Sequence, residues 1–285
     1  MLVATSETRL GEAGVRSTLV LERAVRGTVV LRDQLAFDTR FASPAAGEPE
    51  AVGHVFLLLA GRLVHAGEAM QAPVAFVLAD DELERPRAGS RTFRTDGARA
   101  HVIQLRFATR ALRVPIGLDR GALALPSRAW DAAAALAART DTANLAGLLD
   151  ALASAGAIDG ALAGTLVGDE PERFRRLWAA LQPLYAAYAG TTSLKQLASS
   201  LGMSLRQTGR DAKELAQTFG FSGGYRDSLL VLRLRVAVLL LSAPAATVEK
   251  VARLVGYGSA IAMARAFRDA KLPAPSVVQD ALRGE

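Results

Sequence analysis

Positive charge is concentrated at one end of this chain, and its placement points to phosphate chemistry. Residues 191–285 hold 13 Lys and Arg against 7 Asp and Glu, whereas residues 1–190 hold 21 of each kind. Ammonium and guanidinium groups gathered in one region are typical of a domain that neutralises phosphates, as nucleic-acid-binding domains do. An ordinary basic surface is the alternative. All four lysines of the chain lie in this region: Lys195, Lys213, Lys250 and Lys271.

The overall composition is that of a globular chain. With 285 residues, of which 51% are hydrophobic and 22% charged, the chain can bury a sizeable core, and its length favours two or three domains. It has no cysteine, which excludes a disulfide scaffold and a zinc site of thiolates. No apolar run approaches the roughly 18 residues of a membrane span, and no signal peptide opens the sequence. We therefore expect a cytoplasmic protein without membrane contact.

A repeat indicates which elements carry the basic residues. Residues 194–204 (LKQLASSLGMS) reappear 54 residues later as residues 248–258 (VEKVARLVGYG). This is the pattern of the first helix and turn of a helix-turn-helix, because a small alanine lets the second helix cross closely and a glycine turns the chain with positive φ. Two copies in register predict an α-helical C-terminal domain with two helix-turn-helix units. The matching pairs are Leu194/Val248, Leu197/Val251, Ala198/Ala252, Leu201/Val255 and Gly202/Gly256.

The N-terminal half has the pattern of a β-rich domain. Short segments rich in β-branched residues alternate with glycine and proline turns at roughly even spacing. Such a pattern predicts a small β-barrel or sandwich. The predicted strands are 17–22, 27–32, 51–60, 73–78, 90–95 and 101–107.

The segment between the two is predicted to be helical. Pro126 can open one helix, Asp141 can cap a second, and residues 171–189 form a longer third. The apolar stripe of the third helix is interpreted as a packing surface, with a dimer seam as the alternative. The fold class is therefore α+β multidomain: a β-barrel domain, a helical linker or dimerisation segment, and the helix-turn-helix domain. The predicted boundaries are 1–120, 121–190 and 191–285.

Residues 191–280 resemble the DNA-binding domain of the AraC/XylS family of transcription regulators. The resemblance covers about a third of the chain and implies two helix-turn-helix units joined by a rigid helix, which read neighbouring major-groove segments on one face of DNA. A weaker, cupin-like resemblance in the N-terminal half implies an effector or dimerisation domain. It rests on the strand spacing and on Gly61-Arg62, Ala72-Pro73, Phe76 and Leu105-Arg106-Phe107. The first resemblance rests on Leu197-Ala198, Gly202-Met203-Ser204, Leu232-Arg233-Leu234-Arg235, Ala237, Leu240, Val251-Ala252, Gly256-Tyr257, Arg265-Ala266-Phe267-Arg268 and Pro275.

This family resemblance also implies roles for individual residues. The first recognition helix begins near Leu205, and Arg206, Gln207 and Arg210 fall where the family contacts bases or phosphates. Arginine can bind guanine and glutamine can bind adenine in bidentate fashion, whereas Lys213 suits a phosphate contact. A solvated helix face is the alternative for each. In the second unit the implied contacts are Ser259, Ala260, Arg265 and Arg268.

The two copies depart from the family pattern in different ways. Gly209 lies inside the first recognition helix at a cost of roughly 1 kcal/mol, so we expect that helix to be shifted, bent or more mobile than usual. In the second helix, residues 260–262 (AIA) stand where the family often places polar readers, and such side chains can only contact a thymine methyl group or make no contact. Met263 and Phe267 are expected in the core. We therefore expect the first unit to read bases and the second mainly to position the protein.

No catalytic site, metal or cofactor is predicted. The histidines His54, His65 and His101 lack the H-x-H pair of a metal-binding cupin, and the placement of Glu68 three residues after His65 is common by itself. Satisfied or exposed histidines are the simpler interpretation.

The sequence thus predicts a sequence-specific transcription regulator of the AraC type that is not an enzyme. The expected partners are double-stranded DNA, a second copy of the chain in a homodimer, a small-molecule effector at the N-terminal domain, and RNA polymerase. Two alternatives stay open: a protein-interaction or dimerisation module with degenerate DNA binding, and a cupin-type enzyme fused to a DNA-binding domain.

Overall fold

The computed structural model describes most of the C-terminal two thirds of the chain and several segments of the N-terminal third. The described residues are 3–8, 17–24, 27–35, 52–65, 68–79, 100–117, 121–161, 171–187, 189–190, 192–218, 224–241 and 246–283.

The N-terminal half forms an antiparallel sheet. Its six strands are β1 (Val3–Thr8), β2 (Ser17–Ala24), β3 (Gly27–Leu35), β8 (Ala100–Ala108), β4 (Val52–Ala60) and β7 (Val74–Ala79), in that spatial order. A hairpin of β5 (Arg62–His65) and β6 (Glu68–Gln71) stands beside it. The predicted β-rich half is confirmed. The predicted barrel is not, because the described strands form an open sheet with β1 and β7 at its two ends and no strand pairing between them. The predicted strand 90–95 lies outside the described residues.

The central strand β4 is buried on both faces of this sheet, which explains its unbroken apolar run. Val55 and Leu57 point to one face, where they pack with the helices α2 (Ser127–Ala138) and α3 (Thr142–Ser154). Phe56 lies on the other face and stacks on Phe76 of β7 with ring centroids 4.9 Å apart. Successive side chains of a strand alternate between faces, so one apolar run supplies two cores.

Both helices on this sheet begin where the sequence predicts. Pro126 precedes the first residue of α2. Asp141 caps α3 by accepting a hydrogen bond from the Asn144 N–H at 2.8 Å. That hydrogen bond, followed by the Arg139 side chain, holds the pKa of the Asp141 carboxyl below its ordinary value. The cap is therefore charged at neutral pH and stabilises the helix N-terminus.

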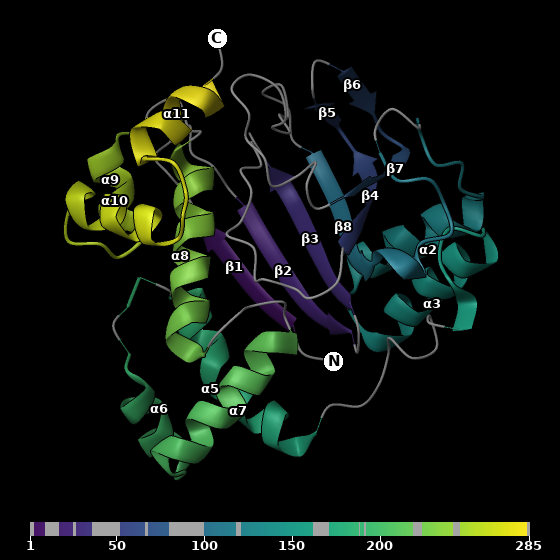
Figure 1. The fold of residues 1–285 in the computed structure, drawn as a ribbon. Coiled ribbons are helices and arrows are strands. Elements are labelled where there is room, and N and C mark those ends of the chain that lie inside the picture. Colours follow the sequence, from purple (N-terminus) through teal and green to yellow (C-terminus); the bar gives the residue numbers. More distant parts are fainter. Residues whose placement is uncertain are drawn as a thin grey trace.

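The C-terminal part is a separate helical cluster (Figure 1). It contains α6 (Leu194–Leu201), α7 (Leu205–Thr218), α8 (Tyr225–Leu241), α9 (Val248–Leu254), α10 (Ala260–Asp269) and α11 (Pro275–Arg283). The earlier helix α5 (Glu172–Ala186) also packs here, against α6 and α7, and lies beside strand β1. The predicted middle segment is thus divided by its packing, since α2 and α3 cover the sheet whereas α5 joins the helical core.

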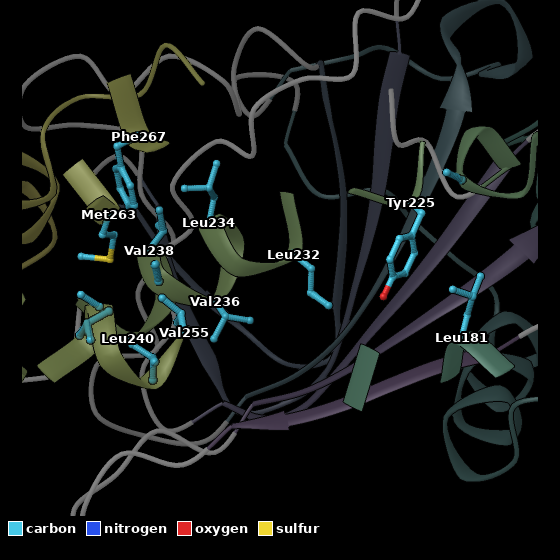
Figure 2. Packing of buried hydrophobic residues seen from close by; sticks show 14 of the residues in the cluster. Leu181, Tyr225, Leu232, Leu234, Val236, Val238, Leu240, Val255, Met263 and Phe267 are labelled. Atoms are coloured by element: carbon cyan, nitrogen blue, oxygen red, sulfur yellow. The ribbon is translucent and has the colours of Figure 1, made fainter. Parts of the chain in front are cut away.

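One hydrophobic core joins all of these helices, and α8 runs through it. Apolar residues occupy all sides of α8, which is typical of a fully buried helix. Figure 2 shows α8 side chains such as Leu232 and Val238 between Leu181 of α5 and Phe267 of α10. Met263 and Phe267 are fully buried, so their predicted place in the core is confirmed.

The short stretch between α5 and α6 runs along α8 and reaches the second helix-turn-helix unit. The Gly190 carbonyl accepts a hydrogen bond from Arg233 Nη2 at 2.6 Å, and the Thr192 carbonyl accepts one from the Tyr225 hydroxyl at 3.0 Å. At Gly256, an added Cβ atom would lie 2.6 Å from the Ala189 carbonyl oxygen. The turn of the second unit is therefore packed directly against the backbone that precedes the first unit.

A pair of glycine substitutions tests this contact. Gly202 and Gly256 both adopt positive φ, 62° and 84°, but a Cβ at Gly202 meets nothing within 4 Å. Gly202→Ala should cost about 1–2 kcal/mol of stability from left-handed backbone strain alone. Gly256→Ala should cost clearly more, because the Ala189 backbone must also move. Thermal denaturation of both variants measures the difference, and equal shifts of the midpoint would contradict the contact.

A third glycine should respond with the opposite sign. The helix α7 runs unbroken over 14 residues and begins at Leu205, with Gly209 in its interior. A Cβ there would lie 3.4 Å from Leu194 Cδ2, the end of a flexible side chain. Gly209→Ala should therefore stabilise the protein by about 0.5–1 kcal/mol, since alanine loses less backbone entropy in a helix. A lower denaturation midpoint would show that α6 and α7 have no room for the methyl group.

Candidate nucleic-acid interface

The two helix-turn-helix units have the same construction. In each, the first helix is followed within two residues by a glycine with positive φ, and a serine then caps the second helix. The Ser204 hydroxyl accepts a hydrogen bond from the Gln207 N–H, and the Ser259 hydroxyl accepts one from the Ala262 N–H, both at 3.2 Å. Matched caps fix the start of each recognition helix.

The turn of the second unit is one residue longer than that of the first. Its first helix repeats the first unit at a spacing of 54 residues, but the capping serines Ser204 and Ser259 are 55 apart because Gly258 is inserted. The recognition helices must therefore be compared at a spacing of 55, which a constant-spacing repeat does not reveal.

At this corrected spacing, the buried and exposed faces of α7 and α10 coincide. The buried positions Thr208 and Ala212 match Met263 and Phe267. The exposed positions match as well, with Arg210 opposite Arg265 and Lys213 opposite Arg268. The paired cations, three residues apart in both helices, are a signal in the sequence that the spacing of 54 hides.

The outward face of α7 carries three exposed cations. Arg206, Arg210 and Lys213 follow one another at intervals of four and three residues, so they share one face of the helix. Within the described part of the chain, Arg206 and Lys213 form no ion pair. Their charges are therefore available to an external anion.

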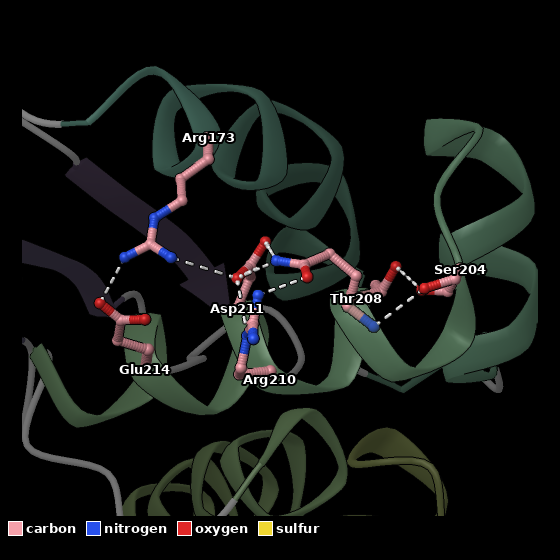
Figure 3. A network of polar contacts seen from close by, with 7 residues as sticks. Arg173, Ser204, Thr208, Arg210, Asp211 and Glu214 are labelled. Atoms are coloured by element: carbon pink, nitrogen blue, oxygen red, sulfur yellow. Dashed lines mark hydrogen bonds and ion pairs between the residues drawn. The ribbon is translucent and has the colours of Figure 1, made fainter.

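Behind this face, a buried carboxylate organises the polar side chains of α7 (Figure 3). The side chain of Asp211 is only 1% exposed, and Gln207 Nε2 donates to both of its oxygens at 2.8 Å. Arg173 of α5 reaches the same carboxylate at 3.5 Å and bonds Glu214 of α7 at 2.6 Å. Arg210 Nη2 in turn donates to Gln207 Oε1 at 2.5 Å.

This network restrains the side chain of one predicted site residue, Gln207. Gln207 does not extend freely beside Arg206, because its amide nitrogen is held by Asp211 and its amide oxygen by Arg210. Sequence reasoning missed Asp211 and its partner Arg173, which is 38 residues away. A carboxylate in a packing position is unusual unless it is paired, and that was the only signal that could have pointed to a partner.

The start of α10 is closed by hydrogen bonds within the unit. The Glu249 carboxylate of α9 accepts the Ala260 N–H at 3.0 Å and pairs with Arg253 at 3.0 Å. The Ala260 N–H, followed by Arg253, holds the pKa of the Glu249 carboxyl below its ordinary value. The stabilisation that the ionised Glu249 carboxylate provides is thus complete above the ordinary pKa of glutamate. It is lost as the pH falls through the lowered pKa of Glu249 in the folded protein. Of the predicted contacts in this unit, Ser259 and Ala260 serve the cap, whereas Arg265 and Arg268 are exposed.

In the described part of the N-terminal sheet, two polar side chains form a buried pair. His54 Nδ1 lies 2.6 Å from Gln104 Nε2 across two neighbouring strands, with both residues buried. His65 and Glu68 face each other in the β5–β6 pairing. Among the described residues, no group of three or more His, Cys, Asp or Glu could hold a metal ion. Within the same residues, no helix has both the length and the apolar character that crossing a bilayer requires.

Among the comparisons with known proteins, those with solved structures give matches. No protein-family model and no curated protein matches it. Among solved structures it is similar to a DNA-binding transcriptional dual regulator from Escherichia coli K-12, at 22% identity over 39% of this chain and 97% of that one, with a TM-score of 0.30. It is also similar to ToxT from Vibrio cholerae with a bound unsaturated fatty acid (11% identity, 90% and 96% covered, TM-score 0.35) and to the AraC-like transcriptional activator CuxR (15%, 79% and 82%, 0.31). At these identities and TM-scores, the function of this chain has to be argued from its own two helix-turn-helix units.

Proposed function

We propose that this chain is a sequence-specific DNA-binding transcription regulator of the AraC type. The observation that carries the proposal is the match between α7 and α10 at the spacing of 55. Each recognition helix is capped by a serine, buries side chains at the equivalent positions Thr208/Met263 and Ala212/Phe267, and exposes a pair of cations at equivalent positions. A second helix presented in this way fits the DNA major groove.

In this proposal the cations supply affinity and a smaller set of side chains supplies specificity. Lys213 and Arg268 contact phosphates, and the counterions that they release drive binding. Arg206, at the exposed start of α7, reads a base by bidentate hydrogen bonds to guanine. Arg210 and Arg265 extend the same faces toward bases or phosphates. Gln207 is a secondary reader, because it must leave Asp211 before it can bond adenine.

The N-terminal β-rich domain is proposed to control this binding. This domain would bind a small-molecule effector and form the homodimer. The protein would act in the cytoplasm, and RNA polymerase would be a further partner once the protein is bound to DNA. A change in dimer geometry would alter which pairs of half-sites can be engaged together. The proposed units are residues 1–120, 121–190 and 191–285, without enzymatic activity or a cofactor.

A second candidate function is a protein-interaction module whose DNA binding has degenerated. The apolar outward residues at the start of α10 and the internal hydrogen bonds of Gln207 favour it. It predicts a stable oligomer that fails to shift DNA from the region upstream of its own coding sequence.

Salt dependence of DNA binding tests the proposal directly. The full-length chain should bind a duplex from its own upstream region with an affinity that falls steeply with salt, by a slope of about −0.9 in log–log form for each phosphate contacted. Lys213→Ala should reduce that slope by about 1, whereas Arg128→Ala, an exposed arginine on α2, should leave it unchanged. Fluorescence anisotropy at several salt concentrations measures both. A slope near zero, or no binding, would favour the interaction module.

Substitution at Arg206 tests base reading separately from charge. Arg206→Ala should weaken binding to a selected cognate duplex by about 1–3 kcal/mol more than binding to a random duplex, because the lost hydrogen bonds are base-specific. Lys213→Ala is the matched control and should weaken both equally. Gln207→Ala should have a smaller effect than Arg206→Ala, since Asp211 already holds that side chain. Equal losses on both duplexes for Arg206→Ala would make it a phosphate contact.

A further inference from the structure

The start of α10 presents an exposed isoleucine where α7 presents an arginine. Ile261 follows the capping Ser259 by two residues, as Arg206 follows Ser204, so the two side chains occupy equivalent positions. Ile261 is 75% exposed, the largest fraction among the exposed large apolar residues that the structure describes. The exposed or half-exposed alanines Ala260, Ala262 and Ala264 surround it.

The same face of α10 continues into cations. Arg265 and Arg268 lie four and seven residues after Ile261 and are exposed, as Arg210 and Lys213 are in α7. The face thus has an apolar tip followed by positive charge. A helix that enters the major groove uses its N-terminal residues for base edges and its flanking residues for phosphates. The apolar tip therefore lies where contacts with bases are made.

Hydrogen-bond readout by side chains is closed at residues 260–262. The Ala260 N–H is taken by Glu249 and the Ala262 N–H by Ser259, and the outward side chains of residues 260–262 have no polar atoms. The Glu249 carboxylate next to the helix start also disfavours a phosphate or a guanine acceptor there. What remains for recognition is the apolar surface of Ile261.

We propose that α10 reads thymine through its 5-methyl group, with Ile261 as the contacting side chain. The methyl group of thymine is the apolar group that base pairs expose in the major groove, and isoleucine offers it a matching surface. This inference rests on the proposed function and specifies the chemistry of the second half-site. A protein partner fits less well, because one isoleucine among alanines supplies far less apolar area than the roughly 800 Å² per partner of a standard interface.

Replacing thymine by deoxyuridine tests the contact at the level of one methyl group. A cognate duplex is first selected from a random 30-base-pair pool with the full-length protein, and each thymine is then replaced by deoxyuridine, which pairs identically but lacks the methyl. Binding should weaken about fourfold at one or two thymines within one half-site, as expected for about one buried methyl group each. Ile261→Ala should weaken binding to the thymine duplex by a similar factor and show no further loss with deoxyuridine.

Two further variants separate this contact from other effects. Val277→Ala removes another exposed apolar side chain, on α11, and should leave both duplexes unaffected. Ile261→Arg introduces the residue type that the first unit has at the equivalent position, Arg206. DNA selected with this variant should prefer guanine at the base position where the wild-type protein prefers thymine. Because Ile261 is exposed, none of these changes should disturb the fold.

Each remaining outcome overturns a stated claim. Equal wild-type binding with thymine and deoxyuridine at every position would refute methyl reading while leaving DNA binding intact. If Ile261→Ala weakens binding by the same factor, relative to the wild-type protein, on the thymine and on the deoxyuridine duplex, the isoleucine lies outside base contact. A change in oligomeric state on Ile261→Ala, without any deoxyuridine effect, would assign the tip to a protein interface. Failure of the wild-type protein to enrich any sequence would instead refute the proposed function itself.

Discussion

The burial of α8 is the interaction on which the arrangement of both helix-turn-helix units depends. This helix of 17 residues, about 25 Å long, is apolar on all sides, and helices from both units pack against it. Moving one unit relative to the other would expose part of this core to water, at about 25 cal/mol for each Å² of apolar surface. The backbone at residues 189–192 adds to the constraint, because it is hydrogen-bonded to α8 and packed against Gly256. The two recognition helices are therefore held as one unit, and under the proposed function a DNA site must fit both at once.

A second constraint connects the first recognition helix to the rest of the chain. Asp211 buries a carboxylate inside the α5–α7 contact, and Arg173 of α5 supplies its positive partner. Removing such a partner leaves a buried charge uncompensated, so α5 and α7 resist separation. Because α5 also lies beside β1, displacement of this sheet edge would act on α5 before it reached α7.

The features that could be predicted from the sequence are those written in local chemistry. The predicted cap at Asp141 is a short-range hydrogen bond between residues three apart, and it is present. The apolar spacing of α10 likewise placed Met263 and Phe267 in the core. Local patterns succeed here because both partners of each interaction lie in the same window of sequence.

What the sequence left undetermined depends on distant pairing or on small shifts. Strand β1 was not predicted, because Val3–Thr8 has no alternation of large apolar side chains and becomes a strand by pairing with β2. The partner of Asp211 lies 38 residues away, and a carboxylate gives no sign of which arginine will neutralise it. Gly209 was expected to leave the first recognition helix shifted, bent or more mobile; α7 begins at Leu205, where the sequence places it, and continues unbroken through Gly209.

The inserted Gly258 alters the comparison of the two units more than any substitution does. At a spacing of 54 the second recognition helix lacks the cations of the first at equivalent positions, as if one unit read bases and the other only anchored. At 55 the cations coincide, and the outward positions where a polar residue of α7 stands against an apolar residue of α10 are Arg206 against Ile261 and Gln207 against Ala262. These two exchanges replace hydrogen-bonding groups by apolar ones at the tip of the helix without disturbing the buried face behind it. Under the proposed function, the two units therefore differ in the kind of base contact that each makes, and a half-site for α10 differs from one for α7 even though the same pattern of charge holds both.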